Sequence, residues 1–164
     1  MTELFEKSSP DADVSGFGFE VTLRIPREAD EERPPSWPIP LLQGVGHYAL
    51  SGHGSLDTGH LIDLGGSLAP TPEGGAPSLL TGLVAVPDAM FGKVDAPFGS
   101  ILFLQLYGLT AAELEAMSSW TMERKVGLVQ EVDRLALTRL ERGPLEQDRR
   151  TAAAYRRHAL GVLL

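Results

Sequence analysis

The sequence predicts an α+β domain in which helices pack on a mixed, mainly antiparallel sheet. Three observations support this fold class. Residues 17–25 alternate between apolar and polar side chains, which is typical of a strand with one buried face. Residues 38–50 carry apolar side chains at helical spacing after a proline-rich break. Residues 79–86 and 98–109 are short apolar runs whose length suits strands.

The N-terminal part of the chain is expected to form one strand and one helix. The strand is predicted over residues 16–27. The helix is predicted over residues 38–50, with Ser36 as its N-cap and prolines in its first turn, where a missing N–H costs little. Gly44 and Gly46 are poor helix formers, so we expect them to let a neighbouring element approach closely.

Three further strands are predicted over residues 60–68, 79–86 and 98–109, with residues 87–97 as a connecting segment. The last strand is the most hydrophobic, and we expect it to be buried on both faces. The chain of 164 residues is long enough to bury one continuous core, so residues 1–164 are interpreted as a single domain.

A helix is expected to follow the last strand, because Thr110 and Glu113 have the spacing of a capping box. This helix is predicted to run through Trp120, with Leu114 and Met117 facing the core and Ala111 on the same side. A final helix rich in Ala and Arg is predicted over residues 147–160.

Composition excludes several classes of function. The formal net charge is −8, from 14 basic and 22 acidic residues, and such a surface repels nucleic acid. There is no cysteine, hence no disulfide, no thiolate metal site and no Cys nucleophile, which fits a reducing cytoplasm. No apolar run approaches the length of a membrane span, and residues 1–7 do not have the pattern of a signal peptide. We therefore expect a cytoplasmic protein without nucleic-acid or membrane partners.

No catalytic motif stands out, so we expect neither an enzyme nor a cofactor. The chain lacks a G-x-S-x-G elbow, and its glycine pairs lack the Lys and helix of a phosphate loop. The alternative is a metal- or ligand-binding protein, or an enzyme, that uses the region of His47, His53 and His60 with Asp57. Their spacing is not specific for a tetrahedral zinc site, so no metal is expected.

Short motifs recur in a fixed order along the chain. They are G-F-G-F-E at 16–20, P-x-W-P-x-x-L-x-Q-x-x-x-x-Y at 35–48, G-H at 59–60, P-F-G at 97–99, F-L-Q-x-x-G at 103–108, T-x-x-E-L at 110–114 and L-T-x-L-x-R at 137–142. In this order and spacing, the chain resembles the N-terminal domain of the Suppressor of Fused family. The resemblance implies the α+β fold of that domain.

The resemblance also implies a non-catalytic module that sequesters a partner protein. Many bacterial members look like immunity proteins that neutralise a toxin domain. In the animal protein, a partner peptide pairs as an added strand, and the Tyr that ends the first helix and an Asp near the G-H stretch belong to the binding region. Tyr48 matches that Tyr, and His60 stands where the Asp would be. The expected interface residues are Tyr48, Asp57, His60 and the acidic run Glu28, Asp30, Glu31 and Glu32, which suits a basic partner such as a nuclease toxin.

The chain departs from the family pattern at both ends. Residues 1–7 match the end of a segment that opens the family domain, so the domain is expected to be short at its N-terminus. An exposed sheet edge or apolar patch, and through it a homodimer, would then follow. The chain ends just after the N-terminal domain, so only half of a two-domain clamp is expected.

Two interpretations remain for residues 122–140. They could form one long amphipathic helix with Met122, Val126, Val129, Val132 and Leu135 on its apolar face. The resemblance favours a helix over residues 122–131 followed by a strand over 134–140, with Leu135 and Leu137 on one face.

Overall fold

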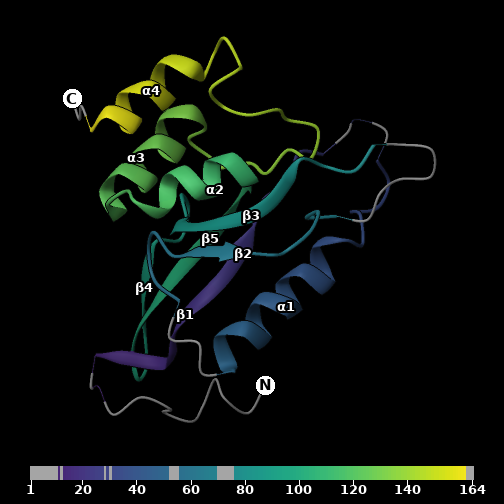
Figure 1. The fold of residues 1–164 in the computed structure, drawn as a ribbon. Coiled ribbons are helices and arrows are strands. Elements are labelled where there is room, and N and C mark those ends of the chain that lie inside the picture. The colour runs from purple at the N-terminus through teal and green to yellow at the C-terminus, as the bar shows by residue number, and fades with distance from the viewer. Residues whose placement is uncertain are drawn as a thin grey trace.

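A computed structural model describes residues 11, 13–27, 29, 31–51, 56–69 and 76–161. Five strands and four helices follow one another within these residues (Figure 1). In chain order they are β1 (Val14–Leu23), α1 (Pro38–Leu50), β2 (Leu61–Asp63), β3 (Leu80–Pro87), β4 (Lys93–Ala96), β5 (Gly99–Thr110), α2 (Ala111–Ser118), α3 (Met122–Val132) and α4 (Ala152–Leu160). The predicted α+β class is confirmed.

The strands form one mixed sheet in the order β1-β5-β3-β2, with β4 pairing to β5 beside β3. Only the β1–β5 pair is parallel, with Val21 opposite Leu104, whereas the other pairs are antiparallel. The expectation of a mainly antiparallel sheet is therefore confirmed. Strands β1 and β2 are the two edges of the sheet, and β5 and β3 lie at its centre.

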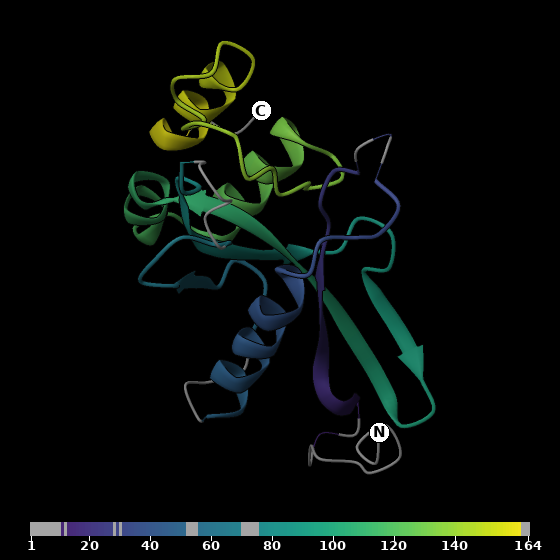
Figure 2. The ribbon, with the colours of Figure 1, turned by 90° about the vertical axis from the view of Figure 1, so that its right-hand side faces the viewer.

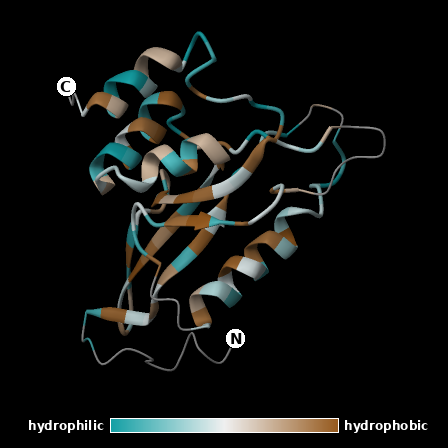
Figure 3. Cartoon of the chain, viewed as in Figure 1, coloured by the Kyte–Doolittle hydropathy of each residue, from teal (hydrophilic) through white to brown (hydrophobic). Residues whose placement is uncertain are grey.

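Two apolar cores lie on opposite faces of this sheet (Figures 1 and 2). Val45 of α1 packs on one face, over Leu83 and Leu106, while Met117 of α2 packs on the other, over Val84. Successive strand residues point to opposite faces, so the buried run of β3 contributes to both cores. Figure 3 shows hydrophobic colour over much of the central strands.

The strand predictions need four corrections. Strand β1 starts at Val14 and ends at Leu23 rather than spanning 16–27, and β2 is limited to Leu61–Asp63 rather than 60–68. Strand β5 is fully buried only over residues 104–110, because its first half extends beyond the helices. The predicted connection over 87–97 contains β4, a strand with an exposed surface and no apolar alternation to reveal it.

The helix predictions were more accurate. Helix α1 has the predicted bounds, but Trp37 rather than Ser36 holds the N-cap position, without a side-chain bond. The capping box of Thr110 and Glu113 is present. Helix α2 ends at Ser118 instead of continuing through Trp120, and Ala111 is exposed, contrary to the prediction.

The segment after α3 is neither the long helix nor the strand that the sequence suggested. The chain leaves α3 at Val132, and Ala136 has a φ of 47°, a conformation foreign to both structures. Residues 136–138 lie instead beside β5 beyond the end of β1, where the Gly108 amide donates to Thr138 Oγ1 at 3.0 Å. The final helix is shorter than predicted, because residues 147–151 form turns before α4 begins.

Candidate functional site

Tyr48 and His60 meet at one edge of the sheet. Tyr48 lies in the last turn of α1, and His60 directly precedes the edge strand β2. The Tyr48 hydroxyl lies 3.3 Å from His60 Nε2, and the two rings are edge-to-face with centroids 6.0 Å apart. Both residues are half-buried, so each presents part of its ring to solvent. The pair combines apolar rings with a polar group, a combination that suits a protein-binding surface.

The turn before β2 is held from two sides. The Gly59 amide donates to the Ala85 carbonyl of β3 at 2.7 Å, and Lys125 Nζ of α3 donates to the Gly59 carbonyl at 3.1 Å. Gly59 has a φ of +79°, and a Cβ there would lie 2.9 Å from Met122 Cγ, so only glycine fits without movement. Burial lowers the pKa of Lys125. These contacts at Gly59 restrict the turn and so determine the position of His60.

Asp57 lies in the same turn and remains exposed. Its Oδ1 accepts the Thr58 amide at 2.6 Å, and its backbone carbonyl accepts the His60 amide at 3.1 Å. The carboxylate thus stabilises the turn while facing solvent. Three of the interface residues expected from the sequence, Tyr48, Asp57 and His60, come together at this end of β2.

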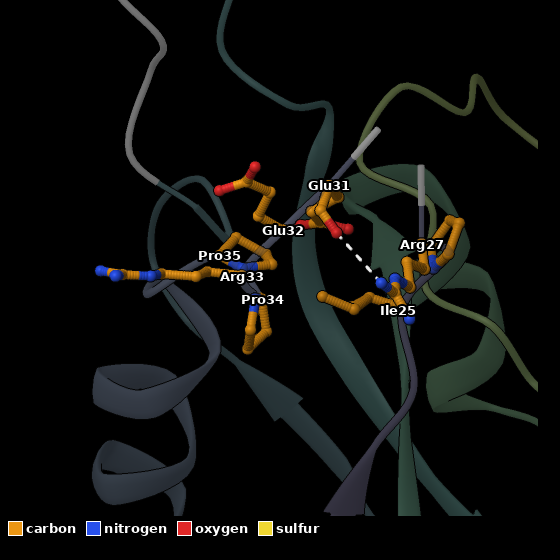
Figure 4. A pocket seen from close by; sticks show the side chains of 8 residues that line it. Ile25, Arg27, Glu31, Glu32, Arg33, Pro34 and Pro35 are labelled. Atoms are coloured by element: carbon orange, nitrogen blue, oxygen red, sulfur yellow. Dashed lines mark hydrogen bonds between the residues drawn. The ribbon is translucent and has the colours of Figure 1, made fainter. Parts of the chain in front are cut away.

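The acidic loop is a separate feature (Figure 4). Glu31 and Glu32 line a hollow of about 350 Å³ together with Arg27 and Arg33, and Arg27 Nη2 donates to the Glu31 carbonyl at 3.1 Å. The acids are thus accompanied by two arginines rather than forming a uniformly negative patch. The loop precedes α1 and Tyr48 lies in its last turn, about 15 Å further along the helix axis. Glu28 and Asp30 lie outside the described residues.

Two hollows flank α1, one on each side. Gly44 borders a hollow of about 410 Å³ towards Leu64 and Leu68, and Gly46 borders one of about 350 Å³ towards β1. A Cβ built at either glycine would have no atom of another described element within 4 Å. The prediction that a neighbouring element of this chain packs closely against these glycines is therefore wrong for the part of the chain that the structure describes.

A buried polar cluster lies on the face of the sheet opposite α1, and the sequence interpretation missed it. Asp88 accepts the Thr22 hydroxyl at 2.7 Å, Arg24 Nη2 at 2.7 Å, and the amides of Met90 and Phe91. Burial alone would raise the pKa of Asp88, but these hydrogen bonds lower it to about 2. The alternation along residues 17–25 predicts that the polar side chains of Thr22 and Arg24 face solvent, and this prediction is wrong. The only signal of the cluster was an acid at the end of a buried apolar run.

The cluster also fixes the segment that follows α3. Arg24 Nη1 donates to Gln105 Oε1 at 2.5 Å, and Gln105 Nε2 donates to the carbonyls of Leu135 and Ala136. Because every member has a partner inside the protein and Gln105 is fully buried, we interpret the cluster as structural rather than catalytic.

The histidine region gives no support for a metal site within the described residues. No group of three or more His, Cys, Asp or Glu side chains there is placed to hold a metal ion. His47 is exposed on α1, His60 contacts Tyr48, and His53 lies outside the described residues. Among the helices that the structure describes, none is both long and apolar enough to cross a membrane.

Comparisons with known proteins agree with the fold. The sequence model of the family described as Suppressor of fused protein (SUFU) matches residues 1–143. The Suppressor of fused homologs of Homo sapiens and Mus musculus are each 32% identical to this chain over 106 residues, which is 65% of this chain and 21% of theirs. The chain thus spans about a fifth of the length of these relatives.

Two solved structures have the same fold. The crystal structure of a Sufu–Fu complex contains a chain that superposes with a TM-score of 0.72 at 27% identity, covering 85% of this chain and 62% of that one. Drosophila Suppressor of Fused superposes with a TM-score of 0.75 at 24% identity, covering 92% of this chain and 36% of that one.

Proposed function

Because the chain belongs to the Suppressor of fused family, we propose that it is a non-catalytic module that binds and sequesters a partner protein. A relative of known structure was solved as a Sufu–Fu complex, so protein binding has a precedent on this fold. The sequence contributes no catalytic motif, and the buried polar side chains of the Asp88 cluster are fully engaged in holding the fold.

The contact between Tyr48 and His60 beside the edge strand β2 carries this proposal. Within the described residues no strand pairs with the outer side of β2, so its backbone groups are available to an extended partner segment. The half-buried rings of Tyr48 and His60 would then contact side chains of that segment, and exposed Asp57 would favour a basic residue in it.

We propose further that the partner is a toxin domain and that the protein acts as its immunity protein. The net charge of −8 supports a basic partner, because opposite charge speeds association. Glu31 and Glu32 would contribute to this attraction from the other end of α1. Glu28 and Asp30 belong to the same acidic run of the sequence and add to its negative charge. A partner that touches both regions must extend along the full length of that helix.

A pull-down from the native host tests the binding surface. We expect the wild-type chain to retain one protein in stoichiometric amount and Tyr48→Ala to lose it. The variant Tyr48→Phe, which removes only the hydroxyl that contacts His60, should show an intermediate loss. Leu160→Ala is the matched control, because it truncates an exposed apolar side chain on α4 and should bind as the wild type does.

The outcomes separate the two parts of the proposal. Retention that is equal for wild type and Tyr48→Ala would exclude this surface as the interface. If the retained protein stops the growth of a bacterial host when produced alone, and growth returns when this chain is produced with it, the immunity role is supported. If the retained protein is not toxic, the proposal that this chain sequesters a partner protein stands, and the proposal that the partner is a toxin is wrong.

A further inference from the structure

Strand β1 has a long edge that carries few of the usual defences against self-association. It pairs with β5 on one side only, and its register is regular from Phe19 to Leu23. No other strand of the described residues lies on its outer side. Natural edge strands are commonly protected by charged residues or prolines, but β1 contains a single charged residue, Glu20. The irregular pairing near Gly16 and Gly18 protects only its first half.

An apolar groove accompanies this edge. The hollow of about 350 Å³ between β1 and α1 is lined by Phe17, Phe19 and Val21 of β1 and by Leu42, Gly46 and Leu50 of α1. Phe17 is 45% exposed and Leu50 is 62% exposed, which is unusual for large apolar side chains in one groove. The absence of a side chain at Gly46 keeps the groove open. Apolar side chains of an added strand would therefore contact both β1 and α1.

We propose that two copies of this chain pair through β1, antiparallel and about a two-fold axis at Val21. Val21 is the middle of the regular stretch, so this register uses all of it. Phe19 of one copy then lies opposite Leu23 of the other, on the same face as α1, where both are apolar. On the opposite face, Glu20 lies opposite Thr22 and not opposite a second Glu20.

Neighbouring registers fit less well. A two-fold axis at Glu20 would place two glutamates opposite each other. With an axis at Thr22, Phe19 of one copy would lie opposite residue 25 of the other, which is beyond the end of β1 at Leu23. A shift by one residue would oppose apolar and polar side chains along the whole stretch. Among these registers, the axis at Val21 uses the whole regular stretch of β1, opposes apolar to apolar residues and places no two like charges opposite each other.

This dimer leaves the Tyr48–His60 surface free. Because β2 is at the other edge of the sheet, the dimer would present two such surfaces at the outer ends of one continuous sheet. The inference does not depend on the proposed function. Each copy carries a charge of −8, so salt should favour the dimer by screening the repulsion between copies.

Single cysteines test the register, because the chain has none of its own. Under mild oxidation Val21→Cys should form an interchain disulfide on the order of ten times faster than Leu23→Cys, since only residue 21 faces its own copy within disulfide distance. Ala112→Cys, exposed on α2, gives the collisional background. A mixture of Phe19→Cys and Leu23→Cys should cross-link between the two variants, whereas each alone should stay near background.

Sedimentation of the wild-type chain completes the test. We expect a dimer fraction that grows with protein concentration and with salt. A chain that stays monomeric over about a hundredfold range of concentration would overturn the proposal. So would a dimer in which Val21→Cys cross-links no faster than Ala112→Cys while the variant keeps the wild-type circular dichroism spectrum, because the two copies would then associate through another surface.

Discussion

Asp88 illustrates how single residues of this protein join elements that are distant in the sequence. Its side chain is fully buried, yet it remains charged because Thr22, Arg24 and two backbone amides donate to it. Thr22 lies in β1 and Arg24 directly follows it, whereas Asp88 directly follows β3. This carboxylate therefore links the edge strand β1 to the end of β3. A buried charge of this kind is tolerated only when its hydrogen bonds are complete.

We expect Asp88→Asn to destabilise the fold by about 3 kcal/mol, because it leaves the partly buried Arg24 without its counter-charge. Thr22→Val is the milder comparison and should cost about 1 kcal/mol for one hydrogen bond. Urea unfolding of both variants and the wild type measures these differences. Equal losses in the two variants would show that the charge itself contributes nothing.

The same residue gives the fold a dependence on acid. The folded pKa of Asp88, about 2, lies below its ordinary value of 3.8, so Asp88 favours the folded state above pH 4. This contribution, about 2 kcal/mol, is lost as the pH falls from 4 towards 2. The acid-induced loss of stability should therefore be smaller in Asp88→Asn than in the wild type, when both are followed by urea unfolding at pH 7 and pH 3.

At the scale of elements, α1 and α3 each contain a glycine, but the two glycines differ in how closely another helix packs against them. Gly127 of α3 lies against His158 of α4, and a Cβ there would be only 2.8 Å from His158 Cε1. Around this contact Glu131 pairs with His158 and Arg157, and Arg124 Nε donates to the His158 carbonyl at 2.7 Å. The helix pair is therefore closely packed at Gly127, whereas no other side chain or element of the described residues comes within 4 Å of a Cβ built at Gly44 of α1.

Alanine at these two glycines should change stability in opposite directions. Gly44→Ala should raise the free energy of unfolding by about 1 kcal/mol, since it improves helix propensity in open space. Gly127→Ala gains the same propensity but must displace the His158 ring, so a net loss of about 1 kcal/mol is expected. Thermal unfolding of the two variants compares them directly. Stabilisation by Gly127→Ala would mean that α4 moves away at little cost.

At the scale of the whole molecule, stability is concentrated in the two central strands. Strand β5 pairs with β1, β3 and β4, and β3 lies between β5 and β2. Apolar cores cover both faces of this centre, where Leu83, Val84, Leu106 and Leu109 are fully buried. Among the described strands, β4 pairs only with β5, and three of its four residues are exposed, so it adds little to either core.

Hydrogen exchange should follow this arrangement. We expect the amides of β3 and of residues 104–110 in β5 to exchange slowest, because they open only when the whole domain unfolds. The amides of β4 should exchange faster by several orders of magnitude, through local opening. Exchange of β4 as slow as that of β3 would show that β4 and the part of β5 that pairs with it unfold together with the central strands.

Local sequence patterns predicted several elements of the fold. The alternation along β1, the apolar spacing of α1 and the capping box of α2 each depend on neighbours a few residues away, and each was predicted correctly apart from shifts at the ends. The resemblance implies that Tyr48 belongs to a partner-binding region, which stays a prediction. The structure adds that the Tyr48 hydroxyl lies 3.3 Å from His60 Nε2.

Other features depended on contacts between distant parts of the chain. Composition and local periodicity alone predict the fold class, the main strands and helices, and the lack of cysteine. The irregular path of residues 134–140 instead depends on long-range contacts, since polar groups of this segment bond to Gln105 and Gly108 of β5. The same holds for the burial of Asp88 and for the position of β1 at an edge, because strand order and long-range hydrogen bonds leave no periodic signal in a sequence.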